Sequence, residues 1–201
     1  QILCLTLKFY RNSHMIKATA FILIGGKSKR FGSPKWAATI DGQTILDRTW
    51  NLCNNFENRF VVGKKPDSIS YPFIKDELEI QSPINGIYSA LNHSDSNWNF
   101  IISCDLPLMT NEIMQSIWKS GKHNRDTIVP MVSDYFQPTC AFYHKRILAQ
   151  ILRQIEKGDL SIHGLLNSIN TETVNMDLNE KGFTNMNTRA DHESLIKKGK
   201  N

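Results

Sequence analysis

In the stretch "FILIGGKSKRFGSPK" (residues 21–35), an apolar run leads directly into a turn rich in glycine and positive charge. The first four residues of the stretch are apolar and complete the run "ATAFILI" (18–24), which predicts a strand covered on both faces. Gly25 and Gly26 follow at once, and four cations lie between positions 27 and 35. Glycine lets a ligand approach the backbone, and successive N–H groups in such a turn can bind an anion. The stretch therefore indicates a polyphosphate site, with a solvated strand-to-loop turn as the alternative.

Strand-like and helix-like patterns alternate along the rest of the chain. We predict strands at 59–63, 71–76, 98–105, 126–132, 137–144 and 172–176, and helices at 44–56, 83–91, 110–119, 145–157, 161–168 and after Thr188. This order predicts an α/β fold with a mostly parallel sheet between two layers of helices. In such sheets the ligand binds beyond the carboxyl ends of the strands. The segments after Ile24, Asp76 and Cys104 should therefore share one edge.

The size and charge of the chain limit the classes of protein to consider. With 201 residues, of which 40% are hydrophobic, the chain suits one domain, which we place at 15–201. Residues 1–14 are treated as an extension of unknown status, with Met15 as a candidate start. The net charge of +5 favours an anionic partner, but no nucleic-acid-binding motif is present. We expect neither a nucleic acid nor a membrane as partner, since no run reaches the ~18 apolar residues of a membrane helix.

The spacing of the cysteines indicates the cellular compartment in which the protein works. Four cysteines are widely spaced and form no C-x-x-C pair, which is typical of reduced thiols rather than of a disulfide framework or a metal cluster. The opening residues also lack the pattern of a signal peptide. We therefore expect a cytoplasmic protein.

Two acids stand at the predicted carboxyl edge. Asp105 leaves the apolar strand in "IISCDLPLM" (101–109), and Pro107 restrains the loop behind it. Beside bound phosphates such an acid can hold Mg²⁺, which takes one or two carboxylates together with phosphates and waters; a cap or turn former is the alternative. Asp76 ends "YPFIKD" (71–76), and its carboxylate could accept N–H bonds from a base edge or bonds from ribose hydroxyls, or serve only in a turn.

The glycine-rich stretch resembles the L-x-G-G-x-S-x-R-x-G-x-x-K signature of the molybdenum cofactor guanylyltransferase family. The matching residues in "LIGGKSKRFGSPK" are Leu23, Gly25, Gly26, Ser28, Arg30, Gly32 and Lys35. Ile24 stands where related turns carry alanine. The resemblance spans about residues 17–195 and implies a three-layer α/β/α, Rossmann-like nucleotidyltransferase fold. The spacing is neither that of a P-loop nor that of a G-x-G-x-x-G dinucleotide site.

This resemblance implies a reaction and its substrates. A terminal phosphate of the molybdenum-pterin cofactor would attack the α-phosphorus of GTP, releasing pyrophosphate and forming the guanine dinucleotide cofactor. Arg30, Lys35 and Asp105 would be catalytic, with Mg²⁺ as cofactor and Asp105 as its ligand. Transient contacts with proteins that supply or accept the cofactor are a further expectation.

The resemblance also implies the binding residues. Those for the nucleotide are Leu23, Ile24, Gly25, Gly26, Lys35, Gly63, Asp76 and Asp105. Asn185 and Asn187, in "FTNMNTRADH" (183–192), would face the acceptor, although Asn187 could instead cap the last helix.

Several positions depart from the family pattern. Gly63 replaces an asparagine and therefore offers only backbone to the nucleotide. Gln137 replaces a histidine, and Arg189 stands in the place of a proline. In "SPINGI" (82–87), Ser82 and Asn85 replace a glycine and an alanine.

Three other functions stay open on the sequence. One is a cytidylyl- or uridylyltransferase acting on a sugar phosphate or another cofactor. A second is a non-catalytic accessory protein that binds the nucleotide or the cofactor, against which Lys35 and Asp105 both argue. The third is a basic RNA-binding domain, which the modest charge excess disfavours.

Overall fold

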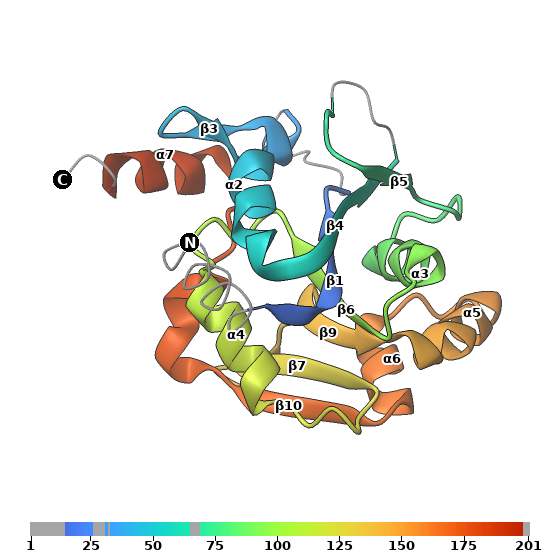
Figure 1. The fold of residues 1–201 in the computed structure, drawn as a ribbon. Coiled ribbons are helices and arrows are strands. Elements are labelled where there is room, and N and C mark those ends of the chain that lie inside the picture. Colours follow the sequence, from blue (N-terminus) through green and yellow to red (C-terminus); the bar gives the residue numbers. More distant parts are fainter. Residues whose placement is uncertain (1–14, 26–30, 32, 65–68, 199–201) are drawn as a thin grey trace, which may run out of the picture.

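The computed structural model describes residues 15–25, 31, 33–64 and 69–198. An eight-stranded sheet runs through the middle of the molecule, with helices on both faces (Figure 1). Its strands are β1 (Ile16–Leu23), β4 (Phe56–Gly63), β5 (Phe73–Lys75), β6 (Trp98–Ser103), β7 (Thr127–Val132), β8 (Tyr135–Phe136), β9 (Cys140–His144) and β10 (Thr171–Asn175). A small separate hairpin consists of β2 (Thr39–Ile40) and β3 (Gln43–Thr44).

Helices fill the connections. The α-helices are α2 (Ile45–Leu52), α3 (Pro83–His93), α4 (Asn111–Ser120), α5 (Leu148–Glu156), α6 (Ile162–Ser168) and α7 (Arg189–Lys198). Shorter 3₁₀ turns are η1 (Lys35–Ala37), η2 (Cys53–Asn55), η3 (Lys145–Ile147) and η4 (Asp177–Phe183). No helix in the described ranges is long and apolar enough to cross a membrane.

The sheet is mostly parallel, as predicted. Its order is β10-β7-β9-β6-β1-β4-β5, with β8 paired to β7. β1 lies between β4 and β6 and is parallel to both, and β5 and β10 join as further parallel strands. β9 runs antiparallel to β6 and β7. The carboxyl ends of β1, β4, β5 and β6 consequently meet at one edge.

Alternating side chains of β1 build a core on each face of the sheet. Ala20 and Ile22 face the core that contains Met114 of α4 and residues of α2, whereas Phe21 and Leu23 face the core built with α3, α5 and α6. Because successive strand residues point to opposite faces, an unbroken apolar run is what a strand between two helical layers requires. The predicted α/β/α layering is confirmed.

One predicted helix boundary is wrong. Thr44 caps α2 as expected, because its hydroxyl accepts from the N–H of Asp47 at 3.0 Å while the Asp47 carboxylate accepts from the N–H of Thr44. The helix ends at Leu52 rather than at 56. Phe56 instead begins β4 and stacks on Phe100 with ring centroids 5.1 Å apart, so burial of an aromatic ring prevails over helical continuation.

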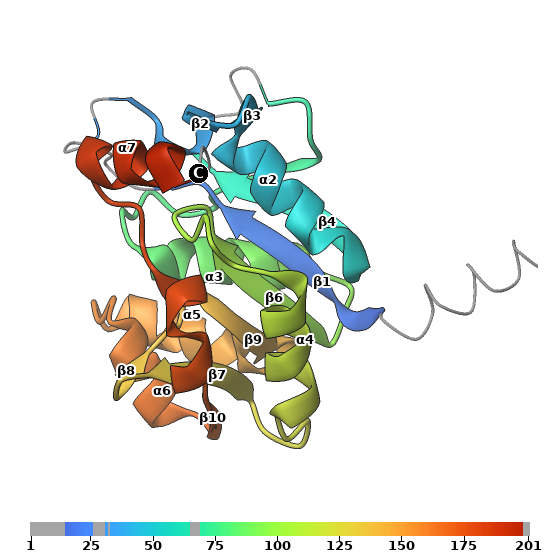
Figure 2. The ribbon, with the colours of Figure 1, turned by 90° about the vertical axis from the view of Figure 1, so that its left-hand side faces the viewer.

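The hairpin β2–β3 lies against α7, although the two are far apart in the sequence. Asp41 and Gly42 both have positive φ, 50° and 78°, at the hairpin turn. Figures 1 and 2 show α7 beside this hairpin, where His192 Nε2 lies 2.7 Å from the carbonyl oxygen of Thr39. Arg189 donates to the carbonyl of Phe31 at 2.9 Å. The start of α7 is thereby held against the backbone at Phe31.

The described cysteines lie inside the protein. Cys53, Cys104 and Cys140 are buried free thiols. Cys4 lies outside the described residues.

Candidate active site

Backbone hydrogen bonds continue the sheet just past the ends of its central strands. The N–H of Ile24 donates to Val62 at 3.0 Å, that of Asp76 to Gly63 at 2.8 Å, and that of Cys104 to Leu23 at 3.2 Å. The segments after Ile24, Asp76 and Cys104 therefore lie at one edge of the sheet, as the strand order predicts.

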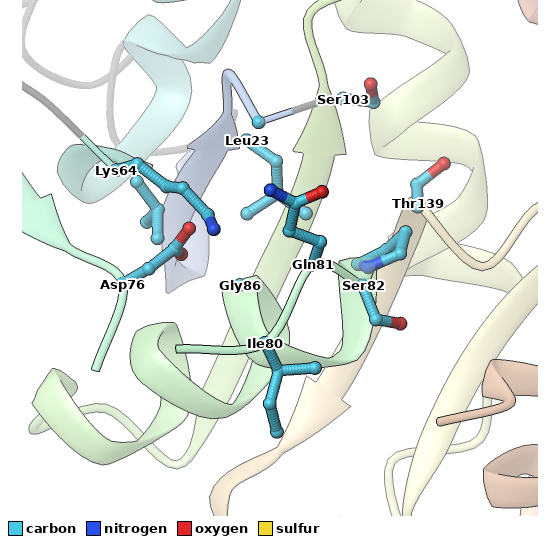
Figure 3. Close-up of a pocket in the computed structure, with 12 residues that line it drawn as sticks. Leu23, Lys64, Asp76, Ile80, Gln81, Ser82, Gly86, Ser103 and Thr139 are labelled. Atoms are coloured by element: carbon cyan, nitrogen blue, oxygen red, sulfur yellow. The ribbon is translucent and has the colours of Figure 1, made fainter. Parts of the chain in front are cut away.

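A pocket of about 370 Å³ opens at this edge (Figure 3). Its lining residues are Leu23, Gly25, Val62, Lys64, Asp76, Ile80, Gln81, Ser82, Pro83, Gly86, Ser103 and Thr139. The volume falls within the range of small-molecule sites, and apolar walls with a few polar groups are typical of them. Three of the residues predicted to bind a nucleotide, namely Leu23, Gly25 and Asp76, line this pocket.

The floor of the pocket depends on close packing of α3 against β1. A Cβ added at Gly86 would lie 3.0 Å from Cδ2 of Leu23, so a glycine permits this approach. Asn85, fully buried beside it, donates to the carbonyls of Leu78 at 2.6 Å and Ile80 at 3.1 Å. The departure at Asn85 thus has a structural reason, because its amide holds the loop that forms one wall.

Gly63 lies under the side chain of Ile24. A Cβ added at Gly63 would lie 2.8 Å from Cγ1 of Ile24, closer than real Cβ contacts allow. The two departures from the family pattern at these positions are therefore coupled, since the larger side chain at Ile24 fills the space that a side chain at Gly63 would need. Gly63 still contributes its carbonyl, which pairs with the N–H of Asp76.

We expect Gly63→Asn to lower the free energy of unfolding by about 1–3 kcal/mol, because the new side chain overpacks against Ile24. The same change in an Ile24→Ala background should cost clearly less. Urea denaturation of the four proteins of this cycle measures the coupling and cancels strand-propensity effects. Equal costs in both backgrounds would show that Ile24 does not obstruct position 63.

Asp76 is half-buried on the wall of the pocket. Burial raises the pKa of its carboxyl above the ordinary value of 3.8, and the charge of Lys64 partly opposes that rise. An acid with a raised pKa that faces a pocket is a candidate for ligand binding.

A second group of polar residues meets at the same edge. Lys35, in η1, donates from Nζ to Oδ1 of Asn187 at 2.8 Å. The N–H of Met186 donates to the carbonyl of Asp105 at 2.8 Å, so Asn185 and Asn187 flank a residue hydrogen-bonded to Asp105. This arrangement brings together three predicted site segments that are far apart in the sequence.

The charges of Asp105 and Lys35 both affect the pKa of the Cys104 thiol. Burial, followed by the negative charge of Asp105, raises the pKa of Cys104 to about 12, while the positive charge of Lys35 lowers it.

Asn187 does not cap the last helix. The hydroxyl of Thr188 accepts from the N–H of Asp191 at 3.2 Å, and the Asp191 carboxylate accepts from the N–H groups of Asn187 and Thr188, both at 2.8 Å. Thr188 is therefore the cap, and the Asn187 amide is engaged with Lys35.

The predicted site residues and the residues that line the pocket overlap only in part. Gly26 and Arg30 lie outside the described residues. Sequence reasoning missed Lys64, although its position directly after a strand that ends at this edge was a usable signal. Gln81 and Thr139 also line the pocket; Thr139 was predicted to lie in a strand at 137–144, whereas β9 begins at Cys140 and leaves Thr139 in the loop before it.

The donor chemistry at this edge suits a hard cation. Across the described part of the chain, no group of three His, Cys, Asp or Glu side chains could hold a metal ion. Mg²⁺ does not need such a group, because one carboxylate with substrate phosphates and waters is sufficient. The carboxylate of Asp105, half-buried at the edge, fits that requirement.

Solved structures first place the chain in the nucleotidyltransferase fold. A crystal structure of molybdopterin-guanine dinucleotide biosynthesis protein A from Archaeoglobus fulgidus superposes with a TM-score of 0.79 at 22% identity, covering 90% of this chain and 98% of that one. A 2-C-methyl-D-erythritol 4-phosphate cytidylyltransferase from Thermus thermophilus gives 0.70 at 12% identity, covering 92% and 100%. These two show the fold.

Comparison of the sequence with known proteins identifies the family. The family model described as "MobA-like NTP transferase domain" matches residues 20–173, and the chain belongs to this family. A protein of Aquifex aeolicus named "Probable molybdenum cofactor guanylyltransferase" is 30% identical over 184 residues, covering 89% of this chain and 90% of its own length. The resemblance stated from the glycine-rich stretch is confirmed, and the family supports an enzyme.

Proposed function

We propose that this protein transfers GMP from GTP to the molybdenum-pterin cofactor, releasing pyrophosphate and forming the guanine dinucleotide cofactor. One observation carries the proposal: a pocket of about 370 Å³ and the group formed by Lys35, Asn187 and Asp105 share the carboxyl edge of the sheet. The names of the curated relatives support guanine and the molybdenum cofactor as substrates.

The reaction calls for positioning and neutralisation of charge more than for a base. An oxygen of the cofactor's terminal phosphate, already anionic, forms a bond to the α-phosphorus of GTP. The bond from that phosphorus to the oxygen bridging to the β-phosphate breaks, and the electron pair leaves with pyrophosphate. Because two anions must meet and a third must depart, fixed positive groups and N–H donors lower the barrier.

Different residues at the carboxyl edge of the sheet bind the phosphates, the nucleoside and the acceptor. The backbone of Gly25 and the ammonium group of Lys35 bind the leaving phosphates, assisted by Gly26 and Arg30. Leu23, Ile24, Gly63 and Asp76 form the part of the site that takes the nucleoside. Asn185 and Asn187 face the acceptor, and the bond from Lys35 to Asn187 orients both side chains before substrate binds.

Asp105 would hold Mg²⁺ in this site. When bound, the ion supplies positive charge to the phosphate oxygens as charge develops in the transition state. The carbonyl of Asp105 is fixed by Met186, which restrains the loop that presents the carboxylate.

The test is release of pyrophosphate by the purified protein supplied with the molybdenum-pterin cofactor, with GTP, CTP, UTP or ATP, and with or without Mg²⁺. We expect release with GTP that depends on Mg²⁺ and on the cofactor. Preference for CTP or UTP would point to a different nucleotidyltransferase. Tight GTP binding without pyrophosphate would point to a non-catalytic accessory protein.

The pH dependence of GTP binding tests the role of Asp76. The ligand's N–H groups need the carboxylate form, so affinity should be full above the raised pKa of Asp76 and should fall as the pH drops through it. The midpoint should therefore lie above the ordinary carboxyl pKa of 3.8.

Asp76→Asn provides the control, because subtracting its profile from that of the wild type removes the titration of the phosphates. We expect the variant to bind weakly at every pH. Superimposable profiles for the two proteins would exclude Asp76 from the binding step.

A further inference from the structure

Lys64 stands next to Asp76 on the same wall of the pocket. β4 and β5 pair in parallel with Gly63 opposite Lys75, and the N–H of Asp76 donates to Gly63. Lys64 and Asp76 are the next residues of the two strands, so they leave the sheet side by side. Figure 3 shows their side chains directed toward one another at one side of the pocket.

The two groups act on each other without a closed ion pair. Burial raises the pKa of Asp76, and the positive charge of Lys64 partly opposes that rise. Their atoms nevertheless do not approach as a salt bridge within the described residues, where the ion pairs involve Lys122, Arg125 and Arg146. The ammonium donors and the carboxylate acceptors are thus both presented to the pocket.

We propose that Lys64 is a specificity-determining residue that, together with Asp76, selects guanine; this rests on the proposed function. The Watson–Crick edge of guanine carries one acceptor, O6, followed by two donors, N1–H and N2–H. The ammonium group of Lys64 donates to O6, and the two carboxylate oxygens of Asp76 accept from the two donors.

The other bases do not fit this pair. Adenine places an amino donor where Lys64 requires an acceptor. Uracil has the acceptor and the first donor, but its O2 then faces the carboxylate. Cytosine turns an amino donor toward Lys64 and its two acceptors, N3 and O2, toward the carboxylate of Asp76. A buried polar group left unpaired weakens binding, so the mismatches select against these bases.

Equilibrium binding to the full-length protein tests this role, with GTP and 2-aminopurine riboside triphosphate as probes. The second probe keeps the phosphates and the 2-amino group but lacks O6 and the proton on N1, so it offers Lys64 no carbonyl and should bind the wild type more weakly than GTP does. We expect Lys64→Met to weaken GTP binding about tenfold or more and to change binding of the second probe by less than about twofold. Lys64→Arg keeps a donor and should retain most of the preference.

Lys75→Met is the matched control, since Lys75 is an exposed neighbour on β5 that does not line the pocket. It should leave both affinities unchanged. Equal losses for the two probes on Lys64→Met would mean that Lys64 serves the phosphates, and no loss would mean that it does not bind; either result overturns its assignment. Wild-type preference for CTP over GTP would overturn the proposed function as well, which separates the two failures.

Discussion

Replacing Asp105 with asparagine is expected to slow pyrophosphate release by about a hundredfold or more, the usual cost of removing one electrostatic contact to a reacting group. The amide keeps the shape of the side chain but not the negative charge that a metal ligand needs. The fold should survive, because the hydrogen bond from Met186 uses the backbone carbonyl of Asp105. Steady-state kinetics with GTP and the cofactor, with a thermal melt of each protein, measure both effects.

Asp95→Asn is the matched control for this change. Asp95 is exposed in the loop before β6, at the opposite edge of the sheet from Asp105. It should leave turnover unchanged. If Asp105→Asn retained wild-type turnover with an intact fold, Asp105 would have no part in the reaction.

Replacing Lys35 with methionine is expected to reduce kcat/KM for GTP by about a hundredfold, since it removes a cation from the leaving phosphates. Methionine retains the length of the side chain, so the loss reports the charge. Lys35→Arg should recover part of the activity. Initial rates over a range of GTP concentrations separate the effects on kcat and KM.

The hydrogen bond between Lys35 and Asn187 allows the prediction to be tested with a double-mutant cycle. If Lys35 acts from the position that Asn187 gives it, Asn187→Ala should cost less than Lys35→Met, and the double variant should be no worse than Lys35→Met alone. Lys157→Met, at the end of α5, is the control for loss of one positive charge. Equal activity of Lys35→Met and Lys157→Met would rule out a contact of Lys35 with the triphosphate.

The fold is predictable from the sequence where a local pattern is long and uninterrupted, or where a capping residue marks the start of a helix. The apolar run at 18–24 is too continuous for an exposed strand, and Thr44 and Thr110 each mark a helix start that the structure confirms. The hairpin β2–β3 escaped prediction because its strands have two residues each, although Asp41–Gly42 is a recognised turn signal. The end of α2 was mispredicted because the ring of Phe56 is held by distant strands rather than by its neighbours.

The site is predictable only to the extent that strand ends define it. That rule placed the segments after Ile24 and Asp76 at one edge, and the family resemblance supplied Leu23, Gly25 and Asp76 as binding residues. Applied to the strand that ends at Gly63, the same rule would also have found Lys64. The contact between Lys35 and Asn187 joins positions 152 residues apart, which no local spacing encodes. The reason for Gly63 is equally non-local, because the atoms that forbid a side chain there belong to Ile24, the residue directly after the neighbouring strand β1.

A crystal structure with a non-hydrolysable GTP analogue, and with Mn²⁺ in place of Mg²⁺, locates the triphosphate and the metal relative to Lys35 and Asp105. We predict that the base lies in the pocket beside Asp76, that the triphosphate extends along Gly25 to Lys35, and that the anomalous signal of the metal touches the carboxylate of Asp105. A triphosphate bound away from Lys35, with a metal that does not contact Asp105, would exclude both residues from the reaction.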